Sequence, residues 1–409
     1  MLTTSRTQQP AEGGNHGWLA RVDEGGPAAA FIVAFSGLYS AAILNMLPAF
    51  VSAWSSTLGA SEQSIGFVAT ANLIAHALGI LLALLLVWRM SLPRIAAIGL
   101  ALAILGDLAS VFAHTTGRLA MLRVICGLGL GLQYGAVTNW FGRSDNAARG
   151  FAAFVMLQFI ISAASYLLVP YVQTVCGNLT PYVVVAPLAA SAILCMPALG
   201  LHGGLRPLRE ATREAFGHRA SSLQRGALVP TLFTLLAFGV FNVAAMGVWS
   251  YMDRYGRVLG LSSSHVSDAL ALGSISGIPG GLIVWFLGKR SGVRRPLLAA
   301  IVIFSLPLAA FAFGHVSPAA FYIGQAAIGL AWTMIVPYFQ EILSVLDPSG
   351  RLSIIGMLAA AVAAAFGPAA IGYLIGQANY RMAFAGALGA LVASSLLAAR
   401  AASAVASRN

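Results

Sequence analysis

Twelve long apolar stretches constrain the fold of this chain more than any other feature. They cover approximately residues 28–54, 63–87, 95–113, 119–141, 150–172, 180–201, 228–251, 264–288, 296–314, 317–345, 352–375 and 382–399. A bilayer core of ~30 Å needs ~20 apolar residues of helix, because each residue adds a rise of ~1.5 Å. Almost every stretch is long enough to cross it. The sequence therefore predicts an all-α membrane protein with twelve transmembrane helices.

Basic residues are concentrated in alternate connecting segments. Of the 23 Lys and Arg, 18 lie in the tails and even-numbered loops and four in the odd-numbered loops. Cytoplasmic loops carry such an excess of positive charge. We therefore expect cytoplasmic tails at 1–27 and 401–409 and a cytoplasmic central loop at 201–227, which leaves two six-helix halves, 28–200 and 228–400. One lysine against 22 arginines is typical of a GC-rich bacterial genome, so the predicted location is a bacterial inner membrane.

The composition argues against a soluble, enzymatic or nucleic-acid-binding protein. Only 9% of residues are charged, against ~25% in soluble domains, and mean hydropathy is +0.84. No phosphate loop, metal-ligand cluster or nucleophile triad stands out, and Gly127-x-Gly129-x-Gly131 follows no predicted strand. We expect no enzymatic activity, no cofactor and no metal. The net charge of +11 comes from loops that should meet anionic lipid, and no aromatic-interleaved basic surface predicts a nucleic-acid partner.

The two halves look duplicated. A shift of 201 residues places Leu58-Gly59 on Leu259-Gly260, and a shift of 202 places Gly127-Leu128 on Gly329-Leu330. Two parallel six-helix repeats predict a pseudo-twofold axis along the membrane normal, with a cavity between them. Such a cavity favours transport by alternating access. A receptor or scaffold is the alternative from another class, and no sizeable soluble domain supports it.

Several motifs carry a resemblance to one known family. A basic loop, Leu287-Gly288-Lys289-Arg290-Ser291-Gly292-Val293-Arg294-Arg295, follows predicted helix 8, and a more divergent copy runs from Val87 to Arg94. Helix 4 carries Arg123-Val-Ile-Cys-Gly127-Leu-Gly129-Leu-Gly131, and helix 11 carries Gly367-Pro368. In these motifs, and over essentially its whole length, the chain resembles the major facilitator superfamily. The resemblance implies two bundles that rock around a central site, with gating-loop residues Arg89, Arg94, Lys289, Arg290, Arg294 and Arg295.

The chain also departs from the family pattern. The aspartate of the loop motif is absent from both halves, where Trp88 and Lys289 stand. In the family this aspartate helps to latch the outward-open state, so the resemblance implies another latch or a looser cytoplasmic gate. The Gly-Pro-x-x-Gly-Gly pattern of antiporters is not visible between Phe154 and Ser165. This departure weakens an assignment to drug/proton antiport.

One arginine lies deep within predicted helix 4. Arg123 shares a helical face with Gly127, Gly131 and Gly135, and these glycines allow close helix packing or leave room for a ligand. A guanidinium inside the hydrocarbon costs at least ~2.5–3.5 kcal/mol, so Arg123 should face a partner unless it snorkels to the surface. Asp107 on helix 3 lies at a similar depth. We predict that the two form an intramembrane pair, either static or broken by protonation or substrate.

The family resemblance implies that helices 1, 4, 7 and 10 line the cavity. The candidate substrate-binding residues are Tyr39, Asn45, Arg123, Asn242, Trp249, Gln325, Trp332 and Thr333, with Gln158 on helix 5 as a further candidate. Bonds between helices are the alternative role for the buried amides. Asp107, His76 and Glu341 are the candidates for proton coupling. For His76 the alternative is a neutral ring bonded to a neighbouring helix, and for Glu341 a solvated interfacial carboxylate.

These residues lead to one predicted function and one alternative. The cavity helices carry a deep arginine and no carboxylate at mid-depth, which favours a small organic anion, a carboxylate with an apolar or aromatic body. We predict a proton-coupled secondary transporter, most simply a symporter, of such a substrate. The alternative is efflux of amphipathic drugs or metabolites by proton antiport. Beyond the substrate and the lipid bilayer we expect no partner, and a monomer.

Overall fold

The structure is a helical bundle with no strand among the residues that it describes. This computed structural model describes residues 27–143, 147–201, 228–287, 292–347, 351–376 and 379–406. The first half contains α1 (Pro27–Asn45), α2 (Leu47–Leu58), α3 (Glu62–Leu86), α4 (Leu92–Ser110), α5 (Thr116–Arg143), α6 (Ala147–Cys176), α7 (Thr180–Cys195) and the 3-10 turns η2 (Gly177–Leu179) and η3 (Met196–Gly200). The second half contains α9 (Leu228–Ser250), α10 (Met252–Val258), α11 (Ser263–Ile275), α12 (Gly277–Leu287), α13 (Arg294–Phe313), α14 (Pro318–Leu346), α15 (Arg351–Ile375) and α16 (Tyr380–Ala406).

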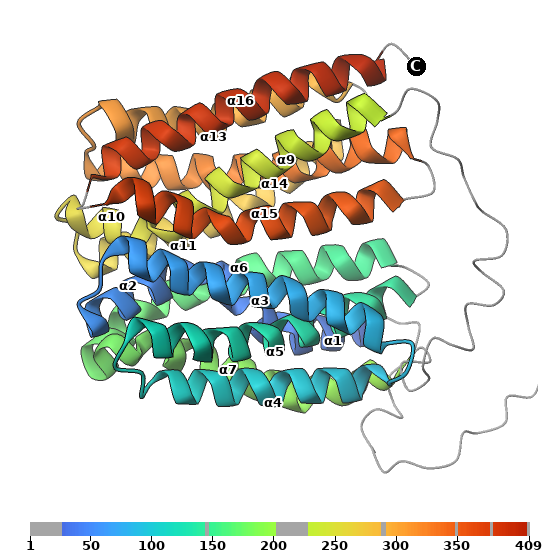
Figure 1. Ribbon diagram of the computed structural model, residues 1–409, viewed down its shortest axis with the longest axis vertical. Helices are drawn as coiled ribbons and strands as arrows, with labels where there is room; N and C mark the ends of the chain where they lie inside the picture. The colour runs from blue at the N-terminus through green and yellow to red at the C-terminus, as the bar shows by residue number, and fades with distance from the viewer. Residues whose placement is uncertain are drawn as a thin grey trace, which may run out of the picture.

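The prediction of twelve crossings is confirmed. Eleven described stretches are long and apolar enough to span a membrane, and one of them, Phe154–Gly200, is 47 residues long. That stretch contains α6 and α7, which lie side by side and are joined by the turn η2 (Figure 1). It therefore supplies two crossings. The chain is a multi-pass membrane protein.

The predicted duplication is visible in the way equivalent helices begin. Ser61 and Ser262 both accept a hydrogen bond from a backbone N–H of the first turn, at 3.3 Å in each half. Thr115 and Ser317 do the same before α5 and α14, at 3.3 and 3.2 Å. Such caps satisfy the unpaired amides of a helix N-terminus. The spacings, 201 and 202 residues, are those of the sequence repeat.

The glycine face of α5 is a packing surface rather than a ligand cavity. A Cβ on Gly127 or Gly131 would overlap the carbonyl oxygens of Asn72 and His76 on α3. The second half repeats the contact, because a Cβ on Gly329 of α14 would overlap the carbonyl oxygen of Gly273 on α11. Close approach of backbones is the usual role of small residues in membrane helices.

Several crossings differ in detail from the single helices predicted for them. Crossing 1 breaks at Met46 into α1 and α2, crossing 8 breaks at Ser276 into α11 and α12, and crossing 7 continues through α10. The last helix extends to Ala406, into the segment assigned to a tail, because residues 401–406 are mostly alanine, the strongest helix former.

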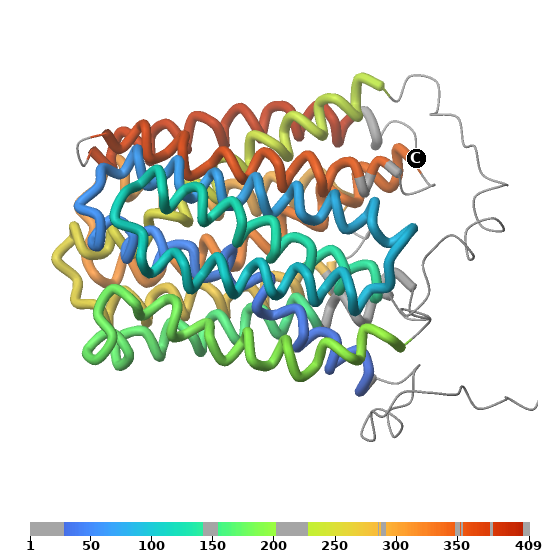
Figure 2. Tube along the Cα trace, turned by 60° about the horizontal axis from the view of Figure 1, so that its bottom comes forward, coloured from blue at the N-terminus to red at the C-terminus, as the bar shows by residue number. Residues whose placement is uncertain are grey.

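The two ends of the molecule differ in charge and in how the halves meet. We name them the arginine-rich end, whose connections and chain ends carry 18 of the 23 Lys and Arg, among them Arg89, Arg94, Arg294 and Arg295, and the arginine-poor end, which carries four: Arg118, Arg254, Arg257 and Arg381. In Figures 1 and 2 the arginine-rich end lies to the right, where α3 connects to α4 and the chain ends.

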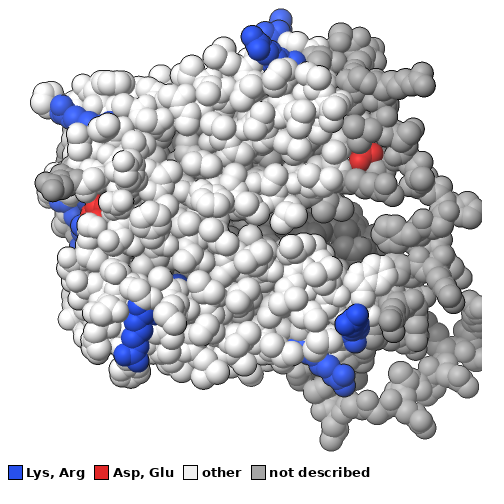
Figure 3. Space-filling model, in the orientation of Figure 1, with Lys and Arg blue, Asp and Glu red and all other residues white. Residues whose placement is uncertain are grey.

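The halves are in contact from the middle of the bundle to the arginine-poor end. There α3 packs on α15 and α6 packs on α11. Ser162 and Ser274 approach to 3.1 Å near the middle, and the Ala369 amide donates to Thr70 at 3.0 Å. At the opposite end a space-filling view shows a recess between the halves (Figure 3). Among the described residues, the halves therefore meet at the arginine-poor end and are separated by a recess toward the arginine-rich end.

Candidate functional site

The break in crossing 1 leaves two backbone carbonyls without their usual partners. Pro48 has no N–H, so it cannot donate to the carbonyl of Leu44, four residues earlier. The amide of Ala49 donates to Met46 at 3.0 Å, which leaves the carbonyl of Asn45 without a helical donor as well. In hydrocarbon such carbonyls must find other donors.

Two aromatic side chains, one from each half, supply these donors. The Tyr166 hydroxyl on α6 donates to the Asn45 carbonyl at 3.0 Å, and the Trp249 indole N–H on α9 donates to the Leu44 carbonyl at 3.1 Å. The two rings meet edge to face with centroids 6.1 Å apart. The bond from Trp249 crosses from the second half to the first. The helix break is therefore also a point of attachment between the halves.

Two more predicted residues, Gln158 and Trp332, take part in further contacts. The Asn45 side chain donates to Gln158 at 3.4 Å, and Phe159 meets Trp332 edge to face at 6.3 Å. Asn45, Gln158, Phe159, Trp249 and Trp332 are all half-buried. We name these five residues and Tyr166 the interface cluster. It brings together four of the predicted substrate-binding residues, drawn from both halves, and its side chains carry amides and aromatic rings but no formal charge.

Three other predicted residues make their contacts within the second half. Asn242 donates to the Phe238 carbonyl of its own helix at 2.8 Å, and Thr333 donates to Leu330 at 2.9 Å. Gln325 is fully buried and donates to the sulfur of Met252 at 2.9 Å. Only the contact of Gln325 joins two helices, whereas Asn242 and Thr333 bond to carbonyls of their own helices.

The predicted contact between Asp107 and Arg123 is confirmed. Arg123 Nη2 lies 2.7 Å from Asp107 Oδ1, with the arginine fully buried and the aspartate 14% exposed. Arg123 also donates to Ser110 Oγ and to the Gly106 carbonyl on α4, and the Tyr39 hydroxyl donates to Asp107 Oδ2 at 2.5 Å. A buried charge needs such a partner and such hydrogen bonds.

This ion pair lies inside the first half rather than between the halves. The Arg123 guanidinium is 5.7 Å from the ring centres of Trp54 on α2 and Tyr182 on α7, so all its neighbours belong to one bundle. Its Nη1 atom is buried and has no hydrogen-bond partner. A small cavity beside it is lined by Tyr39, Asp107 and Arg123 with apolar side chains. Arg123 and Tyr39 therefore sit apart from the interface cluster in this conformation.

The remaining candidates for proton coupling and gating are dispersed. His76 is buried, with Nε2 3.2 Å from the Ser40 carbonyl and its ring edge to face with Tyr134, so it is bonded to a neighbouring helix. Glu341 is half-buried near the arginine-rich end of α14. Arg89, Arg94, Arg294 and Arg295 are exposed at that end, while Lys289 and Arg290 lie outside the described residues.

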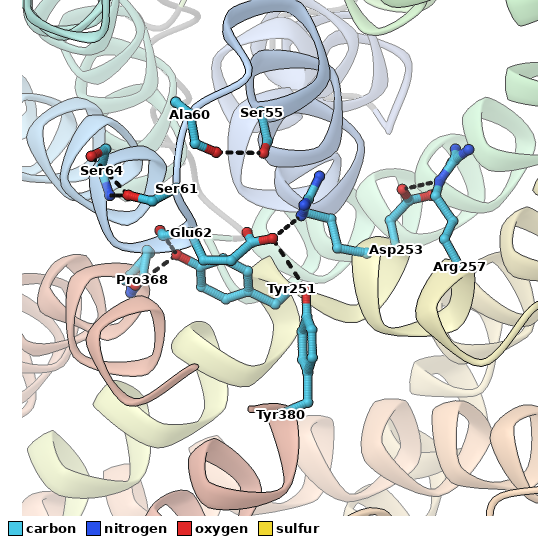
Figure 4. A network of polar contacts seen from close by, with 11 residues as sticks. Ser55, Ala60, Ser61, Glu62, Ser64, Tyr251, Asp253, Arg257, Pro368 and Tyr380 are labelled. Atoms are coloured by element: carbon cyan, nitrogen blue, oxygen red, sulfur yellow. Dashed lines mark hydrogen bonds and ion pairs between the residues drawn. The ribbon is translucent and has the colours of Figure 1, made fainter. Parts of the chain in front are cut away.

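Sequence reasoning missed the polar network that closes the arginine-poor end. There the Glu62 carboxylate on α3 accepts from Arg254 Nε on α10 and, at 3.3 Å, from the Tyr380 hydroxyl on α16 (Figure 4). The Tyr251 hydroxyl donates to the Glu62 carbonyl at 2.8 Å. From the sequence, a glutamate directly after an N-cap serine is expected to be a solvated residue of the first helical turn. Only the packing of α3 against α15 reveals its burial.

Among the described residues, no group of three or more His, Cys, Asp or Glu could hold a metal ion. The two helical halves meet at an uncharged cluster of amides and aromatic rings, and the network around Glu62 closes the arginine-poor end.

Comparison with known proteins gives the family. The model of the Major Facilitator Superfamily matches residues 29–360. No curated protein sequence matches this chain. Solved structures with the same fold include the nucleoside transporter NupG, with a TM-score of 0.72, 15% identity, and coverage of 91% of this chain and 99% of that one. A peptide transporter POT has a TM-score of 0.68 at 15% identity, covering 92% and 94% of the two chains. A D-xylose-proton symporter has a TM-score of 0.67 at 15% identity, covering 92% and 96%.

The chain is thus a multi-pass membrane transporter built of two six-helix halves. It belongs to the major facilitator superfamily, as its sequence motifs predicted.

Proposed function

We propose that the protein is a proton-coupled secondary transporter of a small organic molecule with an aromatic or apolar body. In this proposal the arginine-rich end faces the cytoplasm of a bacterium, both chain ends are cytoplasmic, and the conformation described here is inward-open. The distribution of arginines supports that orientation. Coupling to protons agrees with the resemblance to a proton symporter in fold.

The observation that carries the substrate proposal is the chemistry of the interface cluster. Trp249, Trp332 and Phe159 offer aromatic walls, and Asn45 and Gln158 offer one amide donor–acceptor pair. Because the cluster joins both halves, a ligand bound there touches both, which alternating access requires. Such a site fits an uncharged or weakly charged molecule that carries hydrogen-bonding groups on an aromatic body.

An organic anion is the second candidate, and one observation favours it. The unpartnered Nη1 of Arg123 leaves one guanidinium donor free inside the first half. Asp107 neutralises Arg123 here, so a carboxylate substrate would have to replace Asp107 as its acceptor. Protonation of Asp107 would allow that exchange and would couple the proton to the anion.

Thermal stabilisation of the purified protein by organic acids, neutral aromatics, sugars, amines and drugs tests both candidates. A ligand at 100 times its Kd adds ~2.7 kcal/mol of stability. Neutral aromatic ligands whose effect disappears in Gln158→Ala support the first candidate. Carboxylates whose effect disappears in Arg123→Gln support the second. Stabilisation by lipophilic cations alone contradicts both and favours the efflux of amphipathic compounds.

A further inference from the structure

Glu62 is a first-half residue whose side chain inserts among second-half residues at the arginine-poor end. It occupies the first position of α3, and its side chain points into a cage of second-half residues (Figure 4). Only 8% of the side chain is exposed. The cage consists of Tyr251 and Arg254 around the start of α10, Pro368 on α15 and Tyr380 at the start of α16.

The backbones around this cage are as close as glycine allows. A Cβ on Gly66 would lie 2.5 Å from the Pro368 carbonyl oxygen and 2.6 Å from the Tyr251 hydroxyl. A Cβ on Gly372 would overlap the same hydroxyl. The Tyr251 hydroxyl therefore sits between α3 and α15, and the halves cannot separate at this end without removing Glu62 from the cage.

Only one oxygen of the Glu62 carboxylate has hydrogen-bond partners. Oε1 accepts from both Arg254 and Tyr380, whereas Oε2 is buried and has no hydrogen-bond partner. An ionised carboxyl with one unsolvated oxygen depends on its remaining partners, because burial without hydrogen bonds is costly.

The charged partner of Glu62 in the cage is Arg254. Burial acts to lower the pKa of Arg254, but Glu62 beside it raises that pKa above the ordinary value, so Arg254 stays charged. Asp253, directly before Arg254 on α10, has its own partner in Arg257 at 2.8 Å. The other titratable groups that face Glu62 are the phenols of Tyr251 and Tyr380, and Arg381 follows directly after Tyr380.

We propose that Glu62 is a proton-binding site that opens the arginine-poor end of the transporter. The ionised carboxylate holds the halves together through Arg254 and Tyr380, and protonation removes the charge that attracts Arg254. Arg254 is 26% exposed and can turn to water once it is released. The proposal rests on the alternating-access function proposed above and adds a group that senses pH at the face opposite the open recess.

The test needs no substrate. The full chain, with Cys176→Ser and Cys195→Ser to remove the partly exposed thiols, is reconstituted in lipid nanodiscs. Spin labels at Thr57 and Val258, exposed positions on either side of the closed end, report the distance between the halves by double electron–electron resonance. Acidification should increase the population at the longer distance. Glu62→Gln should show it at neutral pH, with a rise of about tenfold in the open-to-closed ratio, equivalent to about 1.4 kcal/mol, and little further response to acid.

Two further variants keep the result interpretable if Glu62→Gln folds poorly. Tyr380→Phe removes one hydrogen bond from the ionised carboxylate, so the midpoint of opening should move to higher pH. Asp268→Asn, at an exposed carboxylate of α11, should leave the response unchanged. An unaltered acid response in Glu62→Gln, or no acid response in the parent protein, overturns the proposal.

Substrate transport is measured separately. If pH opens the closed end but no proton gradient drives uptake, the proton-sensing proposal stands and the proposed coupling fails. If a gradient drives uptake while opening is independent of Glu62, the coupling stands and this inference fails.

Discussion

Replacing Trp249 with phenylalanine should shift the protein toward the conformation that is open at the arginine-poor end. The substitution keeps an aromatic ring against Tyr166 but removes the indole N–H that donates to the Leu44 carbonyl. That bond exists in the conformation described here and must break when the halves separate at this end. Its loss therefore destabilises one conformation and leaves the other nearly unchanged.

The size of the shift follows from the bond that is lost. Hydrogen bonds between membrane helices average ~0.6 kcal/mol and reach ~1.7 kcal/mol. The Leu44 carbonyl has no helical donor because Pro48 stands four residues later, but the site is half-buried and water from the recess can replace part of the bond. We expect a change of about 1 kcal/mol, which is about fivefold in the ratio of the two conformations.

The labelled pair at Thr57 and Val258 measures this ratio directly. Trp332→Phe is the matched control, because Trp332 meets Phe159 through its ring and the same exchange removes no described bond between the halves. Pro48→Ala returns an N–H donor to the Leu44 carbonyl, so it should reduce the effect of Trp249→Phe in the double variant. Equal distance distributions for Trp249→Phe and Trp332→Phe would show that the bond does not hold the halves together.

Two further predictions concern the interior of the first half. Arg123→Gln and Asp107→Asn should each lower the free energy of unfolding by about 3–5 kcal/mol, because each leaves a buried charge unpaired, and the double variant should lose less than the sum. Thermal unfolding of the four proteins gives the coupling, and simple additivity would contradict the pairing. Gly131→Ala should cost about 1–3 kcal/mol, because its Cβ would overlap the His76 carbonyl on α3, whereas Gly281→Ala has open space around its Cβ and should cost nothing. Equal melting temperatures for these two alanine variants would refute the packing argument.

The sequence predicts the fold because the fold depends on periodic and local signals. The apolar stretches, the arginine distribution and the repeat follow from bilayer thickness and from helix geometry. The pairing of Arg123 with Asp107 is also accessible, since helix rise gives both residues a depth and a buried charge requires a partner. The depth of a residue in the membrane does not show to which side of its helix the side chain points. The sequence therefore predicts the pair but places Arg123 in the cavity, whereas the structure places it inside one bundle.

The contacts between the two halves could not be predicted from the sequence, because they depend on how the helices pack in three dimensions. Pro48 signals a break in crossing 1, yet nothing local indicates that Trp249, more than 200 residues later, donates to the freed carbonyl. The network around Glu62 likewise depends on helix packing that local sequence does not indicate. Its partners come from α10, α15 and α16, and the surrounding glycines read as ordinary membrane-helix residues until the helices are packed.

The separation of charge from the interface cluster restricts how a proton can act on a substrate. Asp107 does not touch the cluster, so in the proposed proton coupling a change of its charge would act through a helix rather than by direct contact. Crossing 1 is the element that joins the two places, because Tyr39 donates to Asp107 and Asn45, on the same helix, bonds to Gln158. The helix ends at Asn45, directly before the break at Met46, and its Leu44 carbonyl accepts the bond from Trp249. A change at Asp107 that moves α1 therefore also moves the carbonyls to which the second half is attached, which links the buried ion pair to the closing of the interface.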